Sequence, residues 1–176
     1  MLNFPIGLDD FAKVEKYYYV DKTALLADLI DYRPYRTLLF TKPRRFGKSL
    51  NLSMVEYFFS NKIYDSSLFI GKEIFRLGES YLAFAGGYPV IHLSFKDVPS
   101  LTYEDFCVDV RKEIARVYRK FPELLKTESL FPVERGNYEN IANDRLGDLN
   151  GYASSLVDLS SMLFAHHGSP VVILVD

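Results

Sequence analysis

Hydrophobic and polar positions follow regular spacings along most of this chain, and the spacings predict an alternation of helices and strands. Apolar residues that recur three or four positions apart indicate helices with one buried side. These predicted helices cover residues 22–31, 48–59, 103–121 and 149–163. Short apolar runs rich in β-branched and aromatic residues indicate buried strands at 37–41, 88–95 and 171–176. Strands that alternate with helices of ten or more residues predict an α/β fold, a parallel sheet flanked by helices on both faces.

Two stretches lack a clear period. Residues 61–87 contain four glycines that interrupt the pattern, and we predict no element there. Residues 131–147 are polar and contain Pro132, Gly136 and Gly147, which are typical of a connecting segment.

The segment 42–49 lies between a predicted strand and a predicted helix, and it ends in Gly47, Lys48 and Ser49. Strand, loop and helix is the order in which a P-loop binds phosphate, with backbone N–H groups at the helix N-terminus wrapping the anion. Lys48 would place its charge on the β and γ phosphates, and Ser49 would offer its hydroxyl to Mg²⁺. Gly47 would let the backbone approach the phosphate closely. The sequence therefore predicts a nucleotide site, with ATP and Mg²⁺ as ligands.

This segment departs from the usual P-loop pattern at its start, because Lys42 stands where G-x-x-x-x-G-K-[ST] has its first glycine. In the alternative interpretation, the glycine merely opens a helix whose first side chains are solvated. Arg44 and Arg45 either contact phosphate or are exposed loop charges. The residues predicted to bind the nucleotide are Arg44, Arg45, Phe46, Gly47, Lys48, Ser49 and Leu50.

The last predicted strand closes on Asp176 after four apolar residues. P-loop ATPases bring a second strand of this form beside the loop, so that its carboxylate binds Mg²⁺. Asp176 and Ser49 are therefore the predicted metal ligands, and Lys48 and Asp176 the predicted catalytic residues. The alternative is a core strand that ends in a turn aspartate, but the order of the elements favours the metal role.

Composition and charge limit the partners. Lys and Arg total 21 against 23 Asp and Glu, and a net charge of −2 gives no overall field that attracts nucleic acid. Basic residues on the predicted helix 103–121 fit a solvated face better than a nucleic-acid surface. The apolar runs fall short of the ~20 residues that a membrane helix needs. We therefore expect no membrane partner. Because the single cysteine allows no internal disulfide, we expect a protein of the cytoplasm.

Several motifs resemble the predicted AAA-ATPase-like proteins of bacteria and archaea, and the resemblance extends over nearly the whole chain. Its clearest part is the run Pro-Arg-Arg-Phe-Gly-Lys-Ser at 43–49, which this family has in place of the glycine-led loop. Lys42 is thus a family trait. Further matching runs are Pro5-Ile6-Gly7, Tyr18-Tyr19-Val20-Asp21-Lys22-Thr23, Leu93-Ser94-Phe95-Lys96 and the strand at 171–176.

The resemblance implies a P-loop NTPase of the additional-strand, AAA-like type, often joined downstream to a domain similar to PD-D/E-X-K nucleases. Residues 1–36 would be an N-terminal extension, and residues 37–176 would run from the P-loop to the Walker B strand. In this family a glutamate that polarises the attacking water typically follows the Walker B aspartate, here Asp176, so we expect a C-terminally truncated domain. With a later strand missing from the sheet, we expect the chain alone to bind ATP poorly, to be inactive and to self-associate.

Two functions fit these residues. The first is ATP binding with Mg²⁺-dependent hydrolysis coupled to a conformational change. The second is a nucleotide-binding switch or interaction module that holds ATP without turnover, and the residue after Asp176 would separate the two, since Glu favours hydrolysis. A small-molecule kinase would need an acceptor site and a basic lid, for which we find no candidate.

Overall fold

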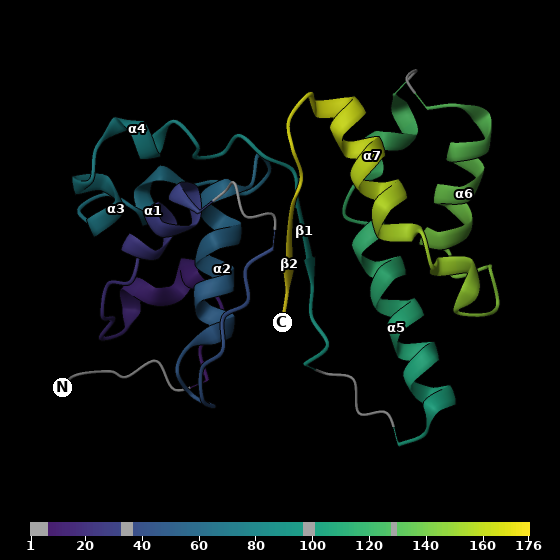
Figure 1. Cartoon of the computed structure of the whole chain (residues 1–176), viewed down its shortest axis with the longest axis horizontal. Helices are drawn as coiled ribbons and strands as arrows, with labels where there is room; N and C mark the ends of the chain where they lie inside the picture. Colours follow the sequence, from purple (N-terminus) through teal and green to yellow (C-terminus); the bar gives the residue numbers. More distant parts are fainter. Residues whose placement is uncertain (1–6, 33–36, 97–100, 128–129) are drawn as a thin grey trace. The chain divides into compact units, whose positions relative to one another are not determined.

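The computed structural model describes residues 7–32, 37–96, 101–127 and 130–176. The chain divides into two compact units, the first ending at Tyr88 and the second beginning at Pro89 (Figure 1). Pro5 and Ile6, which belong to one of the matching motifs, lie outside the described residues.

The first unit is helical. Its α-helices are α1 (Ala24–Asp31), α2 (Lys48–Phe59), α3 (Glu73–Arg76) and α4 (Glu79–Leu82), with short 3₁₀ helices η1 (Phe11–Lys16) and η2 (Ser66–Leu68). The helix predicted at 48–59 is confirmed at both ends. The helix predicted at 22–31 begins two residues later, after Thr23, whose amide and hydroxyl both donate to the Asp21 carboxylate. α3 and α4 fall in the stretch for which the sequence predicts no element.

Aromatic side chains hold the first unit together. Phe11 from η1, Phe58 from α2 and Phe69 are fully buried. The ring of Phe69 lies 5.4 Å from that of Phe11 and 5.3 Å from that of Phe58, measured between centroids. Such pairs add a favourable ring–ring interaction to the burial of apolar area. The core therefore fixes α2, the helix that follows the predicted P-loop.

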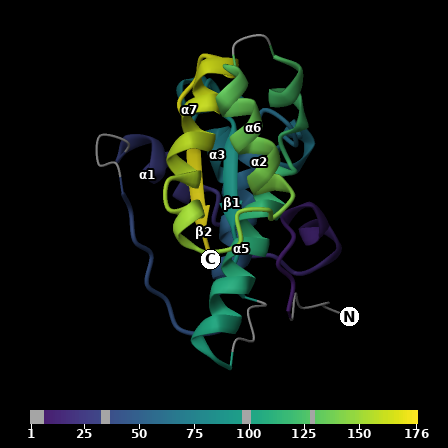
Figure 2. The same ribbon diagram turned by 90° about the vertical axis from the view of Figure 1, so that its right-hand side faces the viewer.

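The second unit places helices on a small parallel sheet. Strand β1 (Val90–Leu93) pairs with β2 (Val172–Val175) in parallel, Val90 opposite Val172 and Leu93 opposite Val175. Between the strands come α5 (Tyr103–Tyr118), η3 (Pro122–Lys126), α6 (Pro132–Ala142), η4 (Asn150–Tyr152) and α7 (Ser155–His167). Figures 1 and 2 show α5, α6 and α7 on one face of the strands. A parallel α/β arrangement is thus confirmed, while helices on both faces of the sheet and the wider P-loop NTPase sheet stay predictions.

The core of the second unit forms where these helices meet β1. Ile91 and Leu93 of β1 pack with buried residues of the helices, among them Tyr118, Tyr138 and Leu159. The Tyr118 hydroxyl donates to the Ser155 carbonyl at 2.6 Å. The Tyr138 hydroxyl lies 2.5 Å from the Tyr118 carbonyl oxygen and 2.9 Å from that of Phe121. Buried hydroxyls need such partners, because an unpaired polar group in a core is costly.

The prediction of a buried strand at 37–41 is wrong. Residues 37–41 adopt no regular secondary structure and are exposed, with Leu39 at 87%. A strand is stable only when its backbone is paired with another strand. In the described part of the chain, β1 and β2 pair with one another. An apolar run of this composition therefore indicates a strand only if a partner is available.

The prediction of a connecting segment at 131–147 is also wrong, because α6 occupies most of these residues. Pro132 opens the helix, where its missing N–H costs nothing. The Glu134 carboxylate accepts a hydrogen bond of 2.8 Å from the Phe131 amide and so caps the first turn. Tyr138, Ile141 and Ala142 then form a buried stripe. Packing of this stripe outweighs the low helix propensity of Gly136.

The remaining predicted elements are present in the structure, but their ends differ from the predicted ones. The strand predicted at 88–95 is reduced to β1, and the helix predicted at 103–121 ends at Tyr118. The helix predicted at 149–163 is replaced by η4 followed by α7, which continues to His167. It stops there because Gly168 adopts a left-handed backbone with φ of 68°.

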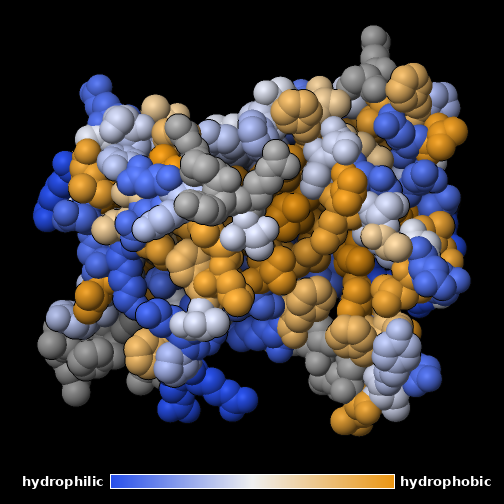
Figure 3. Space-filling view, in the orientation of Figure 1, coloured by the Kyte–Doolittle hydropathy of each residue, from blue (hydrophilic) through white to orange (hydrophobic). Residues whose placement is uncertain are grey.

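Apolar side chains are exposed over α7 and β2, where orange atoms gather in Figure 3. They line an open groove of about 500 Å³, and Val157, Phe164 and Ile173 are its most exposed apolar members. Exposed apolar area of this kind is compatible with self-association, which stays a prediction. None of the helices in the described part of the chain combines the length and the apolar character that a membrane span requires.

Candidate functional site

The segment 42–47 forms a turn that leads directly into α2. Arg45 and Gly47 both have left-handed backbones, with φ of 68° and 77°. Residues that carry a side chain rarely adopt this backbone conformation, whereas glycine does so without a steric penalty. α2 then begins at Lys48, and its first backbone hydrogen bond runs from the Asn51 amide to the Gly47 carbonyl at 2.9 Å. The geometry places a tight loop at the N-terminus of a twelve-residue helix.

The Lys48 side chain folds back over this loop. Its Nζ donates to the carbonyl oxygens of Lys42 at 3.0 Å and Pro43 at 3.2 Å. The ammonium group is thus held across the start of the loop by neutral acceptors. An anionic oxygen makes stronger hydrogen bonds with an ammonium than a carbonyl does.

The first turn of α2 presents backbone donors beside the Lys48 side chain. No side chain caps the helix at Gly47. The N–H groups of Lys48, Ser49 and Leu50 precede the first intrahelical bond, as the leading N–H groups of any helix do. Lys48 and Ser49 are half-buried, whereas the Leu50 side chain is buried and anchors the turn in the core. The helix start therefore offers several N–H groups and the positive end of the helix dipole to an anion.

Positive charge dominates the loop. Arg44, Arg45 and Phe46 are exposed, Phe46 at 56%. In the part of the chain that the structure describes, no carboxylate forms an ion pair with Lys42, Arg44, Arg45 or Lys48. Cations without a nearby carboxylate create a local positive potential that attracts anions even when the net charge of the protein is slightly negative.

Lys22, which no local motif assigns to this loop, also reaches it. Its Nζ donates to the Phe46 carbonyl oxygen at 3.3 Å. It lies 3.8 Å from the position that a Cβ on Gly47 would occupy. The two residues joined by this hydrogen bond are 24 positions apart, so no local spacing indicates the contact. The only sequence signal is that Lys22 stands within one of the motifs of the family resemblance.

Asp176 belongs to the second unit, directly after β2. The Asp176 amide donates to the Leu93 carbonyl, and the Phe95 amide donates to the Asp176 carbonyl, both at 3.0 Å. These bonds continue the parallel pairing and place Asp176 at the carboxyl edge of both strands. Ligands of parallel α/β sheets bind at this edge. Because Ser49 lies in the first unit, a metal site shared by Ser49 and Asp176 stays a prediction.

Comparison with known proteins identifies the class to which this fold and loop belong. Residues 5–176 match a family described as Predicted AAA-ATPase. Because the match covers almost the entire sequence, the chain belongs to this family. The resemblance inferred from the motifs is thereby confirmed.

One curated relative comes from Azotobacter chroococcum mcd 1 and is described as an uncharacterized protein in vnfD 5'region. It is 37% identical over 95 residues, which make up 52% of this chain but only 16% of the relative. The chain therefore spans a small part of that protein's length. No solved structure matches this chain.

Proposed function

We propose that the loop at 42–49 binds the phosphates of ATP. One observation carries this proposal: Lys48 Nζ lies across the loop on the carbonyls of Lys42 and Pro43, at the uncapped N-terminus of α2. Phosphate oxygens would replace these two neutral acceptors with anionic ones. The N–H groups of the first turn would supply the remaining donors. Membership in a family described as Predicted AAA-ATPase supports ATP as the nucleotide.

The residues at the loop fit distinct tasks within this proposal. Lys48 would bind the β and γ phosphates, and Arg44 or Arg45 would add a guanidinium contact. Phe46, Gly47 and Leu50 would contribute backbone rather than side-chain groups. Mg²⁺, when bound, would neutralise charge that develops on the phosphate oxygens during hydrolysis. Ser49 and Asp176 would hold the metal.

The test of the phosphate site is Lys48→Ala in the full gene product that carries this sequence. Loss of the ammonium should weaken ATP binding by about 2–3 kcal/mol, roughly 30- to 150-fold. Titration with a fluorescent ATP analogue measures the affinity. Lys16→Ala, which removes an exposed lysine of η1, is the matched control and should bind as the wild type does. Equal affinity of the Lys48→Ala variant would move the nucleotide site elsewhere.

The test of the hydrolytic role is Asp176→Asn. This substitution keeps the size of the side chain but removes the charge that would hold Mg²⁺, so most Mg²⁺-dependent turnover should disappear while much of the nucleotide affinity remains. Phosphate release with and without Mg²⁺ measures the turnover. If the variant turned over like the wild type, Asp176 would be a turn residue at a strand end. A wild-type protein that binds ATP without turnover would instead be a nucleotide-binding switch.

A further inference from the structure

We propose that Lys22 is a second phosphate-binding residue of the nucleotide site, a role that rests on the function proposed above. Lys22 Nζ contacts the carbonyl of Phe46 at the end of the loop, whereas Lys48 Nζ contacts the carbonyls at its start. Two ammonium groups from distant parts of the sequence thus lie on the backbone of one short loop. The polyphosphate group of a nucleotide is the ligand whose charge matches this arrangement.

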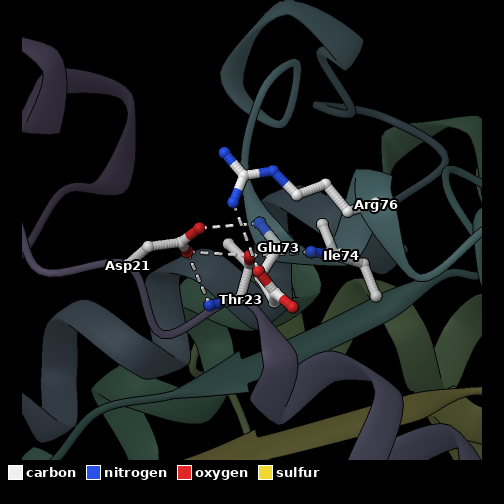
Figure 4. A network of polar contacts seen from close by, with 5 residues as sticks. All are labelled: Asp21, Thr23, Glu73, Ile74 and Arg76. Carbon is white, nitrogen blue, oxygen red and sulfur yellow. Dashed lines mark hydrogen bonds and ion pairs between the residues drawn. The ribbon is translucent and has the colours of Figure 1, made fainter.

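The backbone on one side of Lys22 is fixed by a partly buried polar network, shown in Figure 4. One oxygen of the Asp21 carboxylate accepts from the Thr23 amide and hydroxyl, at 2.9 and 2.8 Å. The other oxygen accepts from the Glu73 amide at 2.7 Å. The Thr23 hydroxyl, which is fully buried, accepts from the Ile74 amide at 3.1 Å. Asp21 and Thr23 therefore tie the segment to the start of α3.

The same network also satisfies the carboxylate of Asp21, the acidic residue next to Lys22 in the sequence. Burial raises the pKa of the Asp21 carboxyl, but hydrogen bonds from the Thr23 and Glu73 amides outweigh burial and leave this pKa below its ordinary value. The carboxylate is thus stabilised by donors other than Lys22. In the described ranges of the chain, no carboxylate forms an ion pair with Lys22. Its ammonium remains available to an anion.

A second tie connects Lys22 to the helix that carries the loop. The Lys22 amide donates to the Tyr19 hydroxyl at 3.3 Å, and this hydroxyl lies 3.7 Å from the sulfur of Met54 in α2. The Lys22 main chain is therefore held from both sides. Only the rotamers of its side chain would have to be ordered when an anion binds. Such preorganisation lowers the entropic cost of binding.

The competing role for Lys22 is structural, a strap that holds the loop through the Phe46 carbonyl. The two roles differ in what they affect. A strap would contribute to the stability of the free protein and would act alike on every nucleotide. A phosphate ligand would contribute little to the free protein and would favour nucleotides that carry more phosphate charge.

The experiment compares Lys22→Met, Lys22→Arg and Lys16→Met in the full gene product, with ATP and AMP as the probes. Lys22→Met should weaken ATP binding about 10-fold, with a much smaller change for AMP and an unchanged midpoint of thermal unfolding without nucleotide. Lys22→Arg should recover most of the ATP affinity, since it keeps the charge. Lys16→Met should bind both nucleotides like the wild type, because this lysine is exposed outside the loop.

Lys48→Ala in the same assay separates the two proposals. If Lys48→Ala loses affinity while Lys22→Met binds ATP like the wild type, the role of Lys22 is overturned and the nucleotide site stands. Equal losses for ATP and AMP, or a lowered unfolding midpoint, would overturn it in favour of the strap. If the wild type binds no ATP, or Lys48→Ala changes nothing, the nucleotide site itself fails.

Discussion

The two units of this protein use aromatic side chains in different ways. In the first unit, the rings of Phe11, Phe58 and Phe69 pack together in the core, and none of these side chains carries a hydroxyl that needs a partner. In the second unit, the largest buried side chains are Tyr118 and Tyr138, and each hydroxyl meets a backbone carbonyl. The comparison shows where each unit keeps its polar contacts. The buried hydroxyls of the first unit belong to small side chains such as Thr23 and Ser53, whereas those of the second unit are carried by its largest buried rings.

The two units also differ in how the ends of their helices are satisfied. The Phe58 ring supports the C-terminal end of α2 by packing, while no side chain caps the N-terminus of this helix, whose first N–H groups lack intrahelical partners. The Tyr138 hydroxyl instead meets carbonyls at the C-terminal end of α5, where the last carbonyls of a helix lack intrahelical partners. The N-terminus of α2 is thus open to a ligand, whereas the C-terminal end of α5 is closed by a hydroxyl of the core.

The largest expected effect comes from Phe58→Ala, which would break the aromatic core of the first unit. The side chain is fully buried, so its removal should cost about 3–5 kcal/mol of the free energy of unfolding. Urea denaturation followed by circular dichroism measures the loss, because the chain has no tryptophan to report by fluorescence. Phe164→Ala is the matched control, since this ring is 54% exposed and should matter by about 0.5 kcal/mol or less. Equal losses would show that the aromatic core does not hold α2.

A smaller effect is expected from Thr23→Val, which tests the polar contacts at the edge of the site. The substitution keeps the shape of the side chain but leaves the Ile74 amide without its acceptor. An unsatisfied buried donor costs about 1–3 kcal/mol. Thr41→Val makes the same change at an exposed position and should be nearly neutral. A Thr23 variant as stable as the control would mean that the network of Figure 4 contributes nothing to the first unit.

Local pattern predicted much of the fold. The helix from Lys48 to Phe59 could be placed at both ends, because a glycine precedes it and apolar residues recur along one side. β2 was located by a continuous apolar run, and its pairing with β1 follows from the α/β alternation. The family resemblance rests on several short motifs, of which the loop at 43–49 is the clearest. In each case the determining residues are close together in the sequence.

The errors have the opposite origin. Residues 37–41 have the composition of a strand, but pairing depends on distant backbone that no local pattern reveals. α6 was hidden because Gly136 and its polar neighbours mask a narrow buried stripe. The contact of Lys22 with the Phe46 carbonyl depends on how two distant segments pack. Local patterns thus predicted the loop of the candidate site but not the lysine that approaches it.

A helix cap of the second unit gives the next prediction, since it is a polar contact at the surface rather than in the core. The Thr102 hydroxyl accepts from the Asp105 amide at 3.1 Å at the start of α5. Thr102→Ala should cost about 1 kcal/mol of the free energy of unfolding, within the usual 0.5–2 for such caps. Thr102→Ser keeps the hydroxyl and should restore most of the loss. If serine were as destabilising as alanine, the capping hydrogen bond would not be the cause.

The smallest expected effect concerns the pH dependence of the tyrosine core. Burial, with a contribution from the Glu123 charge, raises the pKa of Tyr138 from 10.0 to about 12. The folded protein keeps this proton up to about pH 12, whereas the unfolded chain loses it near pH 10. The stability that Tyr138 confers is therefore fully present below about pH 10 and is lost as the pH rises toward 12. Phenylalanine has no proton to lose, so the cost of Tyr138→Phe should shrink over this range.

At neutral pH, Tyr138→Phe should cost about 1 kcal/mol, the net contribution of a typical hydrogen bond, and only a fraction of that cost should remain at about pH 11. Urea unfolding of both proteins at about pH 9 and about pH 11 measures the change. Tyr152 also has a raised pKa, but it is present in wild type and variant, so its titration cancels in the difference. The raised pKa of Tyr118 includes a contribution from Tyr138, so the comparison is made in a Tyr118→Phe background. A cost that stays constant or grows between the two pH values would mean that the Tyr138 hydroxyl ionises as it does in the unfolded chain. The contrast between a phenylalanine core without titratable groups and a tyrosine core that weakens in alkali would then be wrong.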